Sequence, residues 1–176
     1  KGIHDLSFYP ESHMVANALN DGVAFGEKHA REIDALVDLA DLALVPFSQA
    51  EKKLTEAMGS KNPWKRYWAC ITATVHGKSS KALVPDAKKL LDDKNLMVRV
   101  RAAEFLGSIK ALDPMPVLVE VLNQSISPQE ILLTFNSVAY LHDHCGYAFD
   151  ISEVALKVKA GESNRRIDYL SNKTKL

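Results

Sequence analysis

The densest group of potential metal ligands in the chain is the run His142-Asp143-His144-Cys145. Imidazole, carboxylate and thiolate groups together could bind zinc or another transition metal. On one continuous helix, however, residues two apart point about 200° apart, so the two histidines would face different ways. The same run suits the polar C-terminal end of a helix before Gly146, where the helix dipole favours histidine. We therefore predict no metal site here.

A second group places three aromatic rings beside two cationic side chains, as Trp64-Lys65-Arg66-Tyr67-Trp68. Such a mixture can stack on sugars or on nucleic-acid bases. The rings also begin an apolar run at helical spacing, which predicts a buried stripe. This stripe comprises Trp64, Tyr67, Trp68, Ile71 and Val75. We expect Trp68 to lie in the core, and Trp64 is the candidate for a ligand or partner contact at the rim.

Arg99 and Arg101 could bind sulfate or phosphate through two parallel hydrogen bonds each. The charge balance favours internal salt bridges instead, because the chain has 22 Lys plus Arg and 22 Asp plus Glu and Glu104 lies close by. A net charge of zero also argues against a broad surface for nucleic acid or anionic membrane. Arg101 remains a candidate contact for a ligand or partner.

Motifs that would indicate an enzyme are missing from the sequence. It contains no Gly-rich phosphate loop, no nucleophile elbow and no His-Glu-x-x-His segment. Cys70 and Cys145 are too few for a disulfide framework or a zinc site. No apolar run approaches the roughly 18 residues that a membrane span needs. We predict that the chain by itself is not an enzyme and has no catalytic, cofactor-binding or metal residues.

The elements that must position these residues repeat along the chain. Residues 62–70 are echoed by residues 95–103, which begin 33 residues later, and a third, weaker copy opens at Ser127. Asn62 and Asn95 suit helix N-caps, and Pro63 suits a first helical position. Self-similarity at this period is typical of stacked helical hairpins. The sequence therefore predicts an all-α fold, a solenoid of stacked helical hairpins.

We expect one helical-repeat domain over residues 1–176, cut from a longer protein. Residues 1–10 read as a connector, and residues 11–45 as an irregular hairpin. Three repeat hairpins follow in residues 46–142, and a cap and tail occupy residues 146–176.

Apolar residues at helical spacing locate the expected helices. In the first hairpin they run from Met14 to Leu19 and from Ile33 to Leu44. A helix over residues 83–91 should begin the middle repeat, whose second helix should place Phe105 in the core. We expect a capping helix over residues 151–158, followed by a polar tail from Asn164 that frays.

Part of the middle repeat resembles a HEAT repeat, which has an apolar first helix, an Asp at the turn, and Val-Arg-x-x-Ala-Ala-x-x-Leu-Gly on the second helix. The matching residues are Leu90-Leu91-Asp92-Asp93, Val98-Arg99 and Ala102-Ala103-Glu104-Phe105-Leu106-Gly107. In such repeats the turn Asp and the second-helix Arg commonly bond within or between hairpins. The resemblance therefore implies that the three hairpins of residues 46–142 are HEAT-like and stack as a right-handed α-α superhelix, a HEAT/armadillo-like solenoid. It also implies structural roles for Asp93 and Arg99, and for Arg66 at the corresponding place one repeat earlier.

A narrower resemblance is to the helical region that follows the catalytic domain in some bacterial sulfatases related to heparan N-sulfatase (N-sulphoglucosamine sulphohydrolase). The segments that carry it are Phe8-Tyr9-Pro10-Glu11, Phe25-Gly26-Glu27, Leu39-Ala40-Asp41-Leu42-Ala43-Leu44 and Pro63-Trp64-Lys65-Arg66-Tyr67-Trp68-Ala69. The sulfatase motif itself, Cys or Ser-x-Pro or Ala-Ser-Arg, is missing from this chain. The resemblance thus implies a noncatalytic part of a hydrolase of sulfated glycans, exported to the periplasm or cell surface, with calcium only in the catalytic domain.

Three functions follow from these observations. The first is a noncatalytic module that packs on a sulfatase-like hydrolase, its partner being that catalytic domain or another protein surface. The alternative is a stand-alone HEAT-like scaffold for protein interaction, which would be cytoplasmic. The third is a HEAT-fold nucleic-acid binder, which the neutral net charge disfavours.

Overall fold

The computed structural model of the chain describes residues 29–157 and 164–173. It divides into two compact units, Lys1–Asp38 and Leu39–Leu176. In the first unit, the described residues 29–38 are helical. The predicted connector and the predicted helix from Met14 to Leu19 lie outside the described residues, and the single domain stays a prediction.

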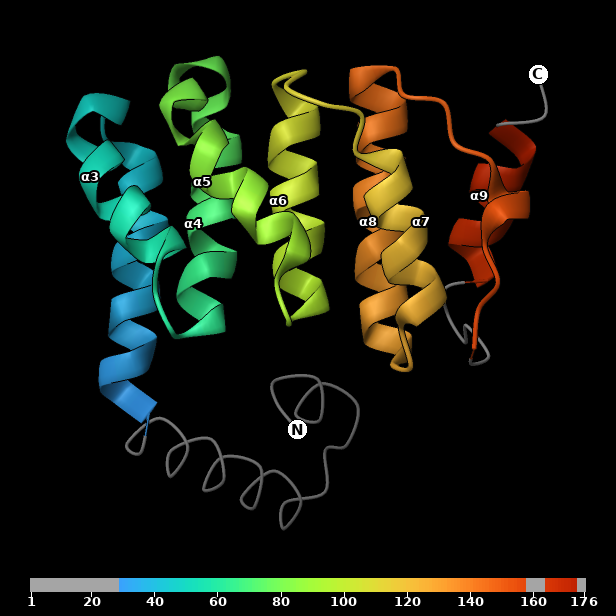
Figure 1. Ribbon diagram of the computed structural model, residues 1–176, viewed down its shortest axis with the longest axis horizontal. Helices are drawn as coiled ribbons and strands as arrows, with labels where there is room; N and C mark the ends of the chain where they lie inside the picture. The colour runs from blue at the N-terminus through green and yellow to red at the C-terminus, as the bar shows by residue number, and fades with distance from the viewer. Residues whose placement is uncertain (1–28, 158–163, 174–176) are drawn as a thin grey trace, which may run out of the picture. The chain divides into compact units, whose positions relative to one another are not determined.

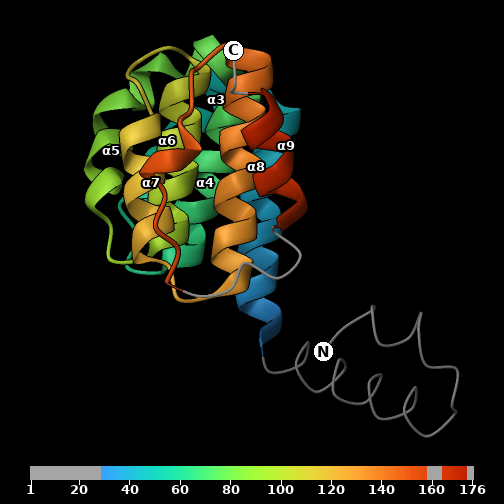
Figure 2. The same ribbon diagram turned by 90° about the vertical axis from the view of Figure 1, so that its right-hand side faces the viewer.

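The second unit is a stack of helical pairs, and its described residues contain no strand. Pairs α3–α4, α5–α6 and α7–α8 follow one another along the long axis (Figure 1). Seen along the stack, α5 and α7 lie in one layer and α8 in the other (Figure 2). The predicted all-α solenoid is thus confirmed. The elements are η1 Leu42–Leu44, α3 Phe47–Met58, α4 Pro63–His76, η2 Gly77–Leu83, α5 Val84–Lys89, η3 Leu90–Asp92, α6 Leu96–Ser108, α7 Met115–Gln124, α8 Pro128–Cys145, η4 Ile151–Glu153 and α9 Asn164–Lys173.

The second helices α4 and α6 begin at side-chain caps. The Asn62 side-chain oxygen accepts a hydrogen bond from the Trp64 N–H at 2.8 Å, and Asn95 accepts one from the Met97 N–H at 2.9 Å. Each bond satisfies a backbone donor that has no partner inside its helix. The repeated asparagine therefore starts two helices at equivalent places in the stack.

The first helix of the middle repeat is not the continuous helix predicted over residues 83–91. It is divided into the short turns η2 and η3 with the six-residue α5 between them. The apolar residues Leu83, Ala87 and Leu90 are nevertheless buried. The Ser80 hydroxyl donates to the Ala73 carbonyl of α4 at 2.8 Å, which holds this broken segment against the second helix of the preceding pair.

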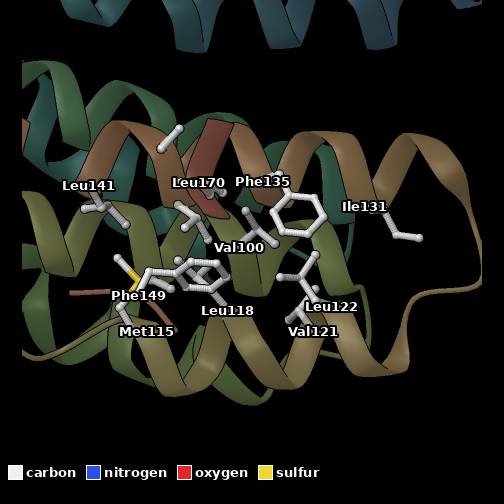
Figure 3. Close-up of a cluster of buried hydrophobic side chains, with 13 residues drawn as sticks. Val100, Met115, Leu118, Val121, Leu122, Ile131, Phe135, Leu141, Phe149 and Leu170 are labelled. Carbon is white, nitrogen blue, oxygen red and sulfur yellow. The ribbon is translucent and has the colours of Figure 1, made fainter. Parts of the chain in front are cut away.

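Helix α6 is the centre of the core, because α4, α5, α7 and α8 all contact it. Phe105 is fully buried there, as predicted, and so is Phe135 of α8. Figure 3 shows the apolar cluster that joins α6, α7 and α8 to Leu170 of α9. Apolar side chains from four helices thus share one cluster at this end of the stack.

The C-terminal end of the stack differs from the prediction. Residues 151–153 form the short turn η4, and residues 154–156 have no regular structure, so the helix predicted from residue 151 is wrong. The Asn123 side chain accepts a hydrogen bond from the Ala155 N–H at 2.6 Å, which fixes extended backbone in place of helix. The tail predicted to fray instead forms α9, whose Leu170 is fully buried. Helix α9 is mostly polar, but its Leu170 packs into the apolar cluster of α7 and α8.

Candidate interaction surface

Helix α4 does not bury the stripe that its apolar spacing predicted. Trp64 is 49% exposed and Val75 is 64% exposed, and Tyr67, Trp68 and Ile71 are half-buried. The buried side instead consists of small residues, which let α3 and α6 pack closely. These buried residues are Ala69, Cys70, Thr72 and Ala73. The prediction of Trp68 as a core residue is therefore wrong, because α4 turns its large side chains outward.

The half-buried residues of helix α6 have the same spacing as the exposed and half-buried residues of α4. Met97, Arg101, Glu104 and Ser108 are half-buried, whereas residues 98–100, 102–103 and 105–107 are buried. Each of the four lies 33 residues after a residue of the α4 stripe. The two helices therefore present matching sides of the stack.

Helix α8 continues this surface about 32 residues further on. Its Asn136 is exposed, Leu133 is half-buried, and Tyr140 is 40% exposed. We name the outward sides of the three helices the second-helix face. It comprises Trp64, Tyr67, Trp68, Ile71 and Val75 of α4, Met97, Arg101, Glu104 and Ser108 of α6, and Leu133, Asn136 and Tyr140 of α8.

Aromatic rings form the α4 part of the second-helix face. Trp64 and Trp68 each pack edge-on against Tyr67, with ring centroids 5.9 and 6.2 Å apart. The Arg101 guanidinium lies over the Tyr67 ring, 5.3 Å from its centroid. Edge-to-face rings and a cation over a ring are both favourable arrangements. The rings are thus held in fixed orientations while the Trp64 indole stays accessible.

A polar ladder crosses the second-helix face from α4 to α8. Arg101 donates to the Tyr67 hydroxyl at 3.1 Å and pairs with Glu104 at 2.7 Å. The Ser137 hydroxyl of α8 donates to the same Glu104 carboxylate. The charges of Arg101 and Glu104 therefore compensate each other, and three helices are tied together.

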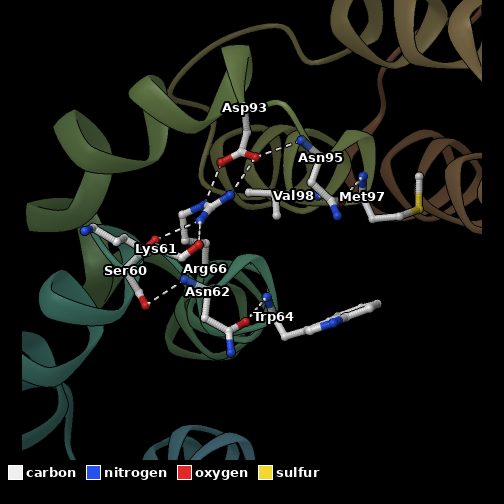
Figure 4. A network of polar contacts seen from close by, with 9 residues as sticks. All are labelled: Ser60, Lys61, Asn62, Trp64, Arg66, Asp93, Asn95, Met97 and Val98. Carbon is white, nitrogen blue, oxygen red and sulfur yellow. Dashed lines mark hydrogen bonds and ion pairs between the residues drawn. The ribbon is translucent and has the colours of Figure 1, made fainter. Parts of the chain in front are cut away.

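Arg66 and Asp93 join successive repeats at the turns (Figure 4). The Arg66 Nε donates to Asp93 at 2.6 Å and its Nη2 at 2.8 Å, and its Nη1 donates to the Ser60 carbonyl at 2.7 Å. Asp93 also accepts the Asn95 N–H at 2.9 Å. Burial acts to raise the pKa of Asp93, but the bonds from Arg66 and Asn95 prevail and lower it.

Arg99, the counterpart of Arg66 one repeat later, has different partners. It pairs with Glu120 at 3.0 Å and donates to Gln124 at 3.2 Å. Its buried Nε has no hydrogen-bond partner. Ser125 has nearly the backbone angles of Asp93, φ −60° and ψ 135° against −60° and 144°, but carries no carboxylate. The turn before α8 thus lacks the carboxylate that pairs with Arg66 in the turn before α6.

The remaining residues with possible chemistry lie apart. Cys70 is fully buried, and burial is the main cause that raises the pKa of its thiol to about 12. The His142 ring bonds to the Tyr147 carbonyl at 2.8 Å, just beyond the helix end at Gly146. Within the described residues, no group of three or more His, Cys, Asp or Glu side chains could hold a metal ion.

Sequence reasoning named Glu104 only as a salt-bridge partner of the arginines, and it missed Asn136 and Tyr140 of α8 as part of the same surface. The 32- to 33-residue repeat could have aligned them, since it pairs each position of α6 with one of α4 and one of α8. Exposure was the missing information, because an apolar stripe at helical spacing looks the same on a buried and on an outward side.

The fold defines a class, the all-α helical-repeat proteins. The family model described as HEAT repeats matches residues 51–129, from within α3 to the start of α8. No curated protein and no solved structure matches the chain. Over the parts that the structure describes, no helix combines the length and apolar character needed to cross a membrane.

Proposed function

We propose that this chain is a noncatalytic scaffold that binds a protein partner through the second-helix face. The observation that carries the proposal is the exposure of large side chains there, with Trp64 at 49%, Val75 at 64% and Tyr140 at 40%. Tryptophan and tyrosine are the residues most often found at the energetic centres of protein interfaces. Large apolar side chains exposed on one face of a helical stack suit a protein interface.

The arginines are paired within the chain, and this favours a protein over an anionic polymer as the binding partner. Arg66, Arg99 and Arg101 are all paired with carboxylates at 2.6 to 3.0 Å. Binding to nucleic acid or to a sulfated glycan relies on cations that are free to meet phosphate or sulfate groups. The ring cluster, in contrast, needs no ion to bind an apolar side chain.

The test is to purify a partner captured from the source organism and to measure its affinity for variants by calorimetry. Trp64→Ala should weaken binding by about 2 kcal/mol, as expected for an interface centre. Ile126→Ala is the matched control, because Ile126 is 73% exposed but lies in the turn between α7 and α8. Its affinity should equal that of the wild type.

Two results would overturn the proposal. Equal affinities of the Trp64→Ala protein and the wild type would remove the second-helix face from the interface. Binding of heparin or duplex DNA at physiological salt that is lost in Arg101→Ala would indicate an anion-binding surface instead. Thermal melting of each variant separates loss of contact from loss of fold.

A narrower form of the proposal makes the partner the catalytic domain of a sulfatase-like hydrolase of sulfated glycans. The support for this form is that a docked catalytic domain would cover the exposed apolar residues. In this form any calcium and all catalytic groups belong to that domain, in the periplasm or at the cell surface, whereas a stand-alone scaffold would be cytoplasmic. A reading frame that joins this chain to a domain with the Cys-x-Pro-Ser-Arg motif would support the narrower form.

A further inference from the structure

A recess lies at the C-terminal end of the stack, away from the second-helix face. It is a hollow of about 490 Å³ between the N-terminal part of α7 and residues 148–153. That volume lies within the range of small-ligand sites. Met115, Val119 and Phe149 supply apolar lining, and Asp113, Asp150 and Glu153 supply carboxylates.

Hydrogen bonds fix the wall of the recess at both ends. The Tyr147 hydroxyl donates to two backbone carbonyls at 3.0 and 2.9 Å. The Asn123 amide donates to the Glu153 carbonyl at 3.1 Å and accepts from the Ala155 N–H at 2.6 Å. Phe149, between them, is 4% exposed and anchors the wall in the core. The recess is therefore formed before any ligand arrives, which lowers the entropic cost of binding.

The charge of the recess is not balanced by its own lining. Three of its lining residues are acidic and none is basic. Lys110 belongs to the preceding turn, but its ammonium group bonds to the Cys145 carbonyl and lies 3.9 Å from the centre of the Tyr147 ring. A cation would thus complement the rim, while the apolar lining suits hydrocarbon.

The character of this cation follows from the two kinds of residue that line the recess. Carboxylates and apolar side chains lie side by side in the lining, so a cation that carries an apolar stem suits it better than a bare ion. Lysine and arginine side chains have this form, since their methylene stems pack on apolar surface while the charged ends seek carboxylates.

We propose that this recess binds a lysine or arginine side chain of a partner protein segment, with the stem along the apolar lining at Val119 and the charged end at the rim of acids. This is a second contact, separate from the second-helix face. A partner could therefore bind at either place without the other.

The test uses the peptide acetyl-Gly-Arg-Gly-amide and follows the methyl signals of Met115 and Val119 by NMR. The signals should shift and saturate, and the peptide with citrulline in place of arginine should bind more weakly by about fivefold or more, because it keeps the shape and loses the charge. Glu153→Gln should weaken arginine binding to a similar degree. Glu51→Gln on α3 removes the same charge elsewhere and should leave binding unchanged.

Three outcomes would overturn the inference. The first is that the methyl signals of Met115 and Val119 show no saturating shift, and the second is that the arginine and citrulline peptides bind equally well. The third is that calcium or magnesium chloride shifts the same signals at lower concentration than the peptide does, which would indicate a site for an inorganic cation. Because Glu153 uses only its backbone carbonyl to bond Asn123, Glu153→Gln leaves that bond of the wall in place. None of these outcomes bears on Trp64→Ala, so the two proposals fail separately.

Discussion

Arg66 ties the turn before α6 to the repeat that precedes it. Its guanidinium meets both oxygens of Asp93 and a backbone carbonyl of the preceding turn. The side chains are only 15% and 8% exposed, so water does not replace a lost partner. An ion pair of this kind is costly to break, because removing one member leaves a buried charge without compensation.

Asp93→Asn should lower the free energy of unfolding by about 3 kcal/mol at neutral pH. Because the folded pKa of Asp93 is lowered, its contribution is present above the ordinary pKa of about 4 and is lost as pH falls through the folded value. The difference between wild type and variant should therefore shrink below about pH 4. Urea unfolding at several pH values measures it.

The control for this prediction is Asp86→Asn. Asp86 also pairs with a cation, Lys89, at 2.8 Å, but their side chains are 31% and 75% exposed. Exposed pairs contribute about 0 to 1 kcal/mol. A loss in Asp86→Asn as large as that in Asp93→Asn would contradict the role given to burial.

The two cysteines should react at very different rates. Cys70 is fully buried with a raised pKa of about 12, so its reactive thiolate is scarce and shielded. Cys145 is half-buried at the end of α8. A thiol reagent should modify Cys145 in the folded protein and Cys70 only after denaturant is added. Rapid modification of both thiols in the folded protein would contradict the placement of Cys70.

At the scale of elements, Gly107 sets how closely α6 approaches its neighbours. A Cβ atom at this position would lie 2.6 Å from Pro114 Cγ and 3.0 Å from Leu141 Cδ2. Distances this short force side chains or backbone to move. The glycine thus allows α6 to pack against both the connection to α7 and helix α8.

Gly107→Ala should therefore destabilise the protein by about 2 kcal/mol, although alanine is the better helix former by about 1 kcal/mol. Gly59→Ala is the matched control, because its Cβ would meet no atom closer than 3.7 Å and its φ is −84°. That change should be neutral or slightly stabilising. Chemical unfolding of both variants measures the difference, and equal effects would show that Gly107 has room.

The helix starts and the core of α6 could be predicted from sequence, whereas the orientation of α4 could not. Asn62 and Asn95 carry local cap chemistry, which depends on few residues. Phe105 lies on the part of α6 that other helices cover, and α6 has several such neighbours, so its burial follows readily from the apolar pattern. The apolar stripe of α4, in contrast, suits the core as well as a surface, and only the packing of Ala69 and Ala73 against other helices decides between them.

The candidate surface and the C-terminal cap depended on contacts between distant segments. The ladder from Tyr67 through Arg101 and Glu104 to Ser137 depends on how α4, α6 and α8 are placed relative to one another, which a single helix does not encode. The irregular backbone after η4 depends on the Asn123 side chain, about 30 residues earlier. Local helical spacing predicted a helix there because it carries no information about such a distant partner.

At the scale of the whole molecule, a solenoid distributes its stability unequally. Each repeat contacts only its neighbours, so the end of the stack depends on what covers it. At the C-terminal end this cover includes α9, whose Leu170 reaches the cluster of α7 and α8. A change at α9 should therefore loosen one end, whereas a change in α6 should affect the stack on both sides.

Leu170→Ala should empty a buried site at a cost of about 2 to 5 kcal/mol. Hydrogen exchange should speed up in α7 and α8, next to the emptied site, and change least in α3 and α4. Phe105→Ala is the comparison, because the same kind of loss in α6 should raise exchange in α4 and α8 alike. Uniformly faster exchange from α3 to α8 in Leu170→Ala would instead mean that the stack unfolds as a single cooperative unit, and that nearest-neighbour coupling between repeats is too strong for its ends to open separately.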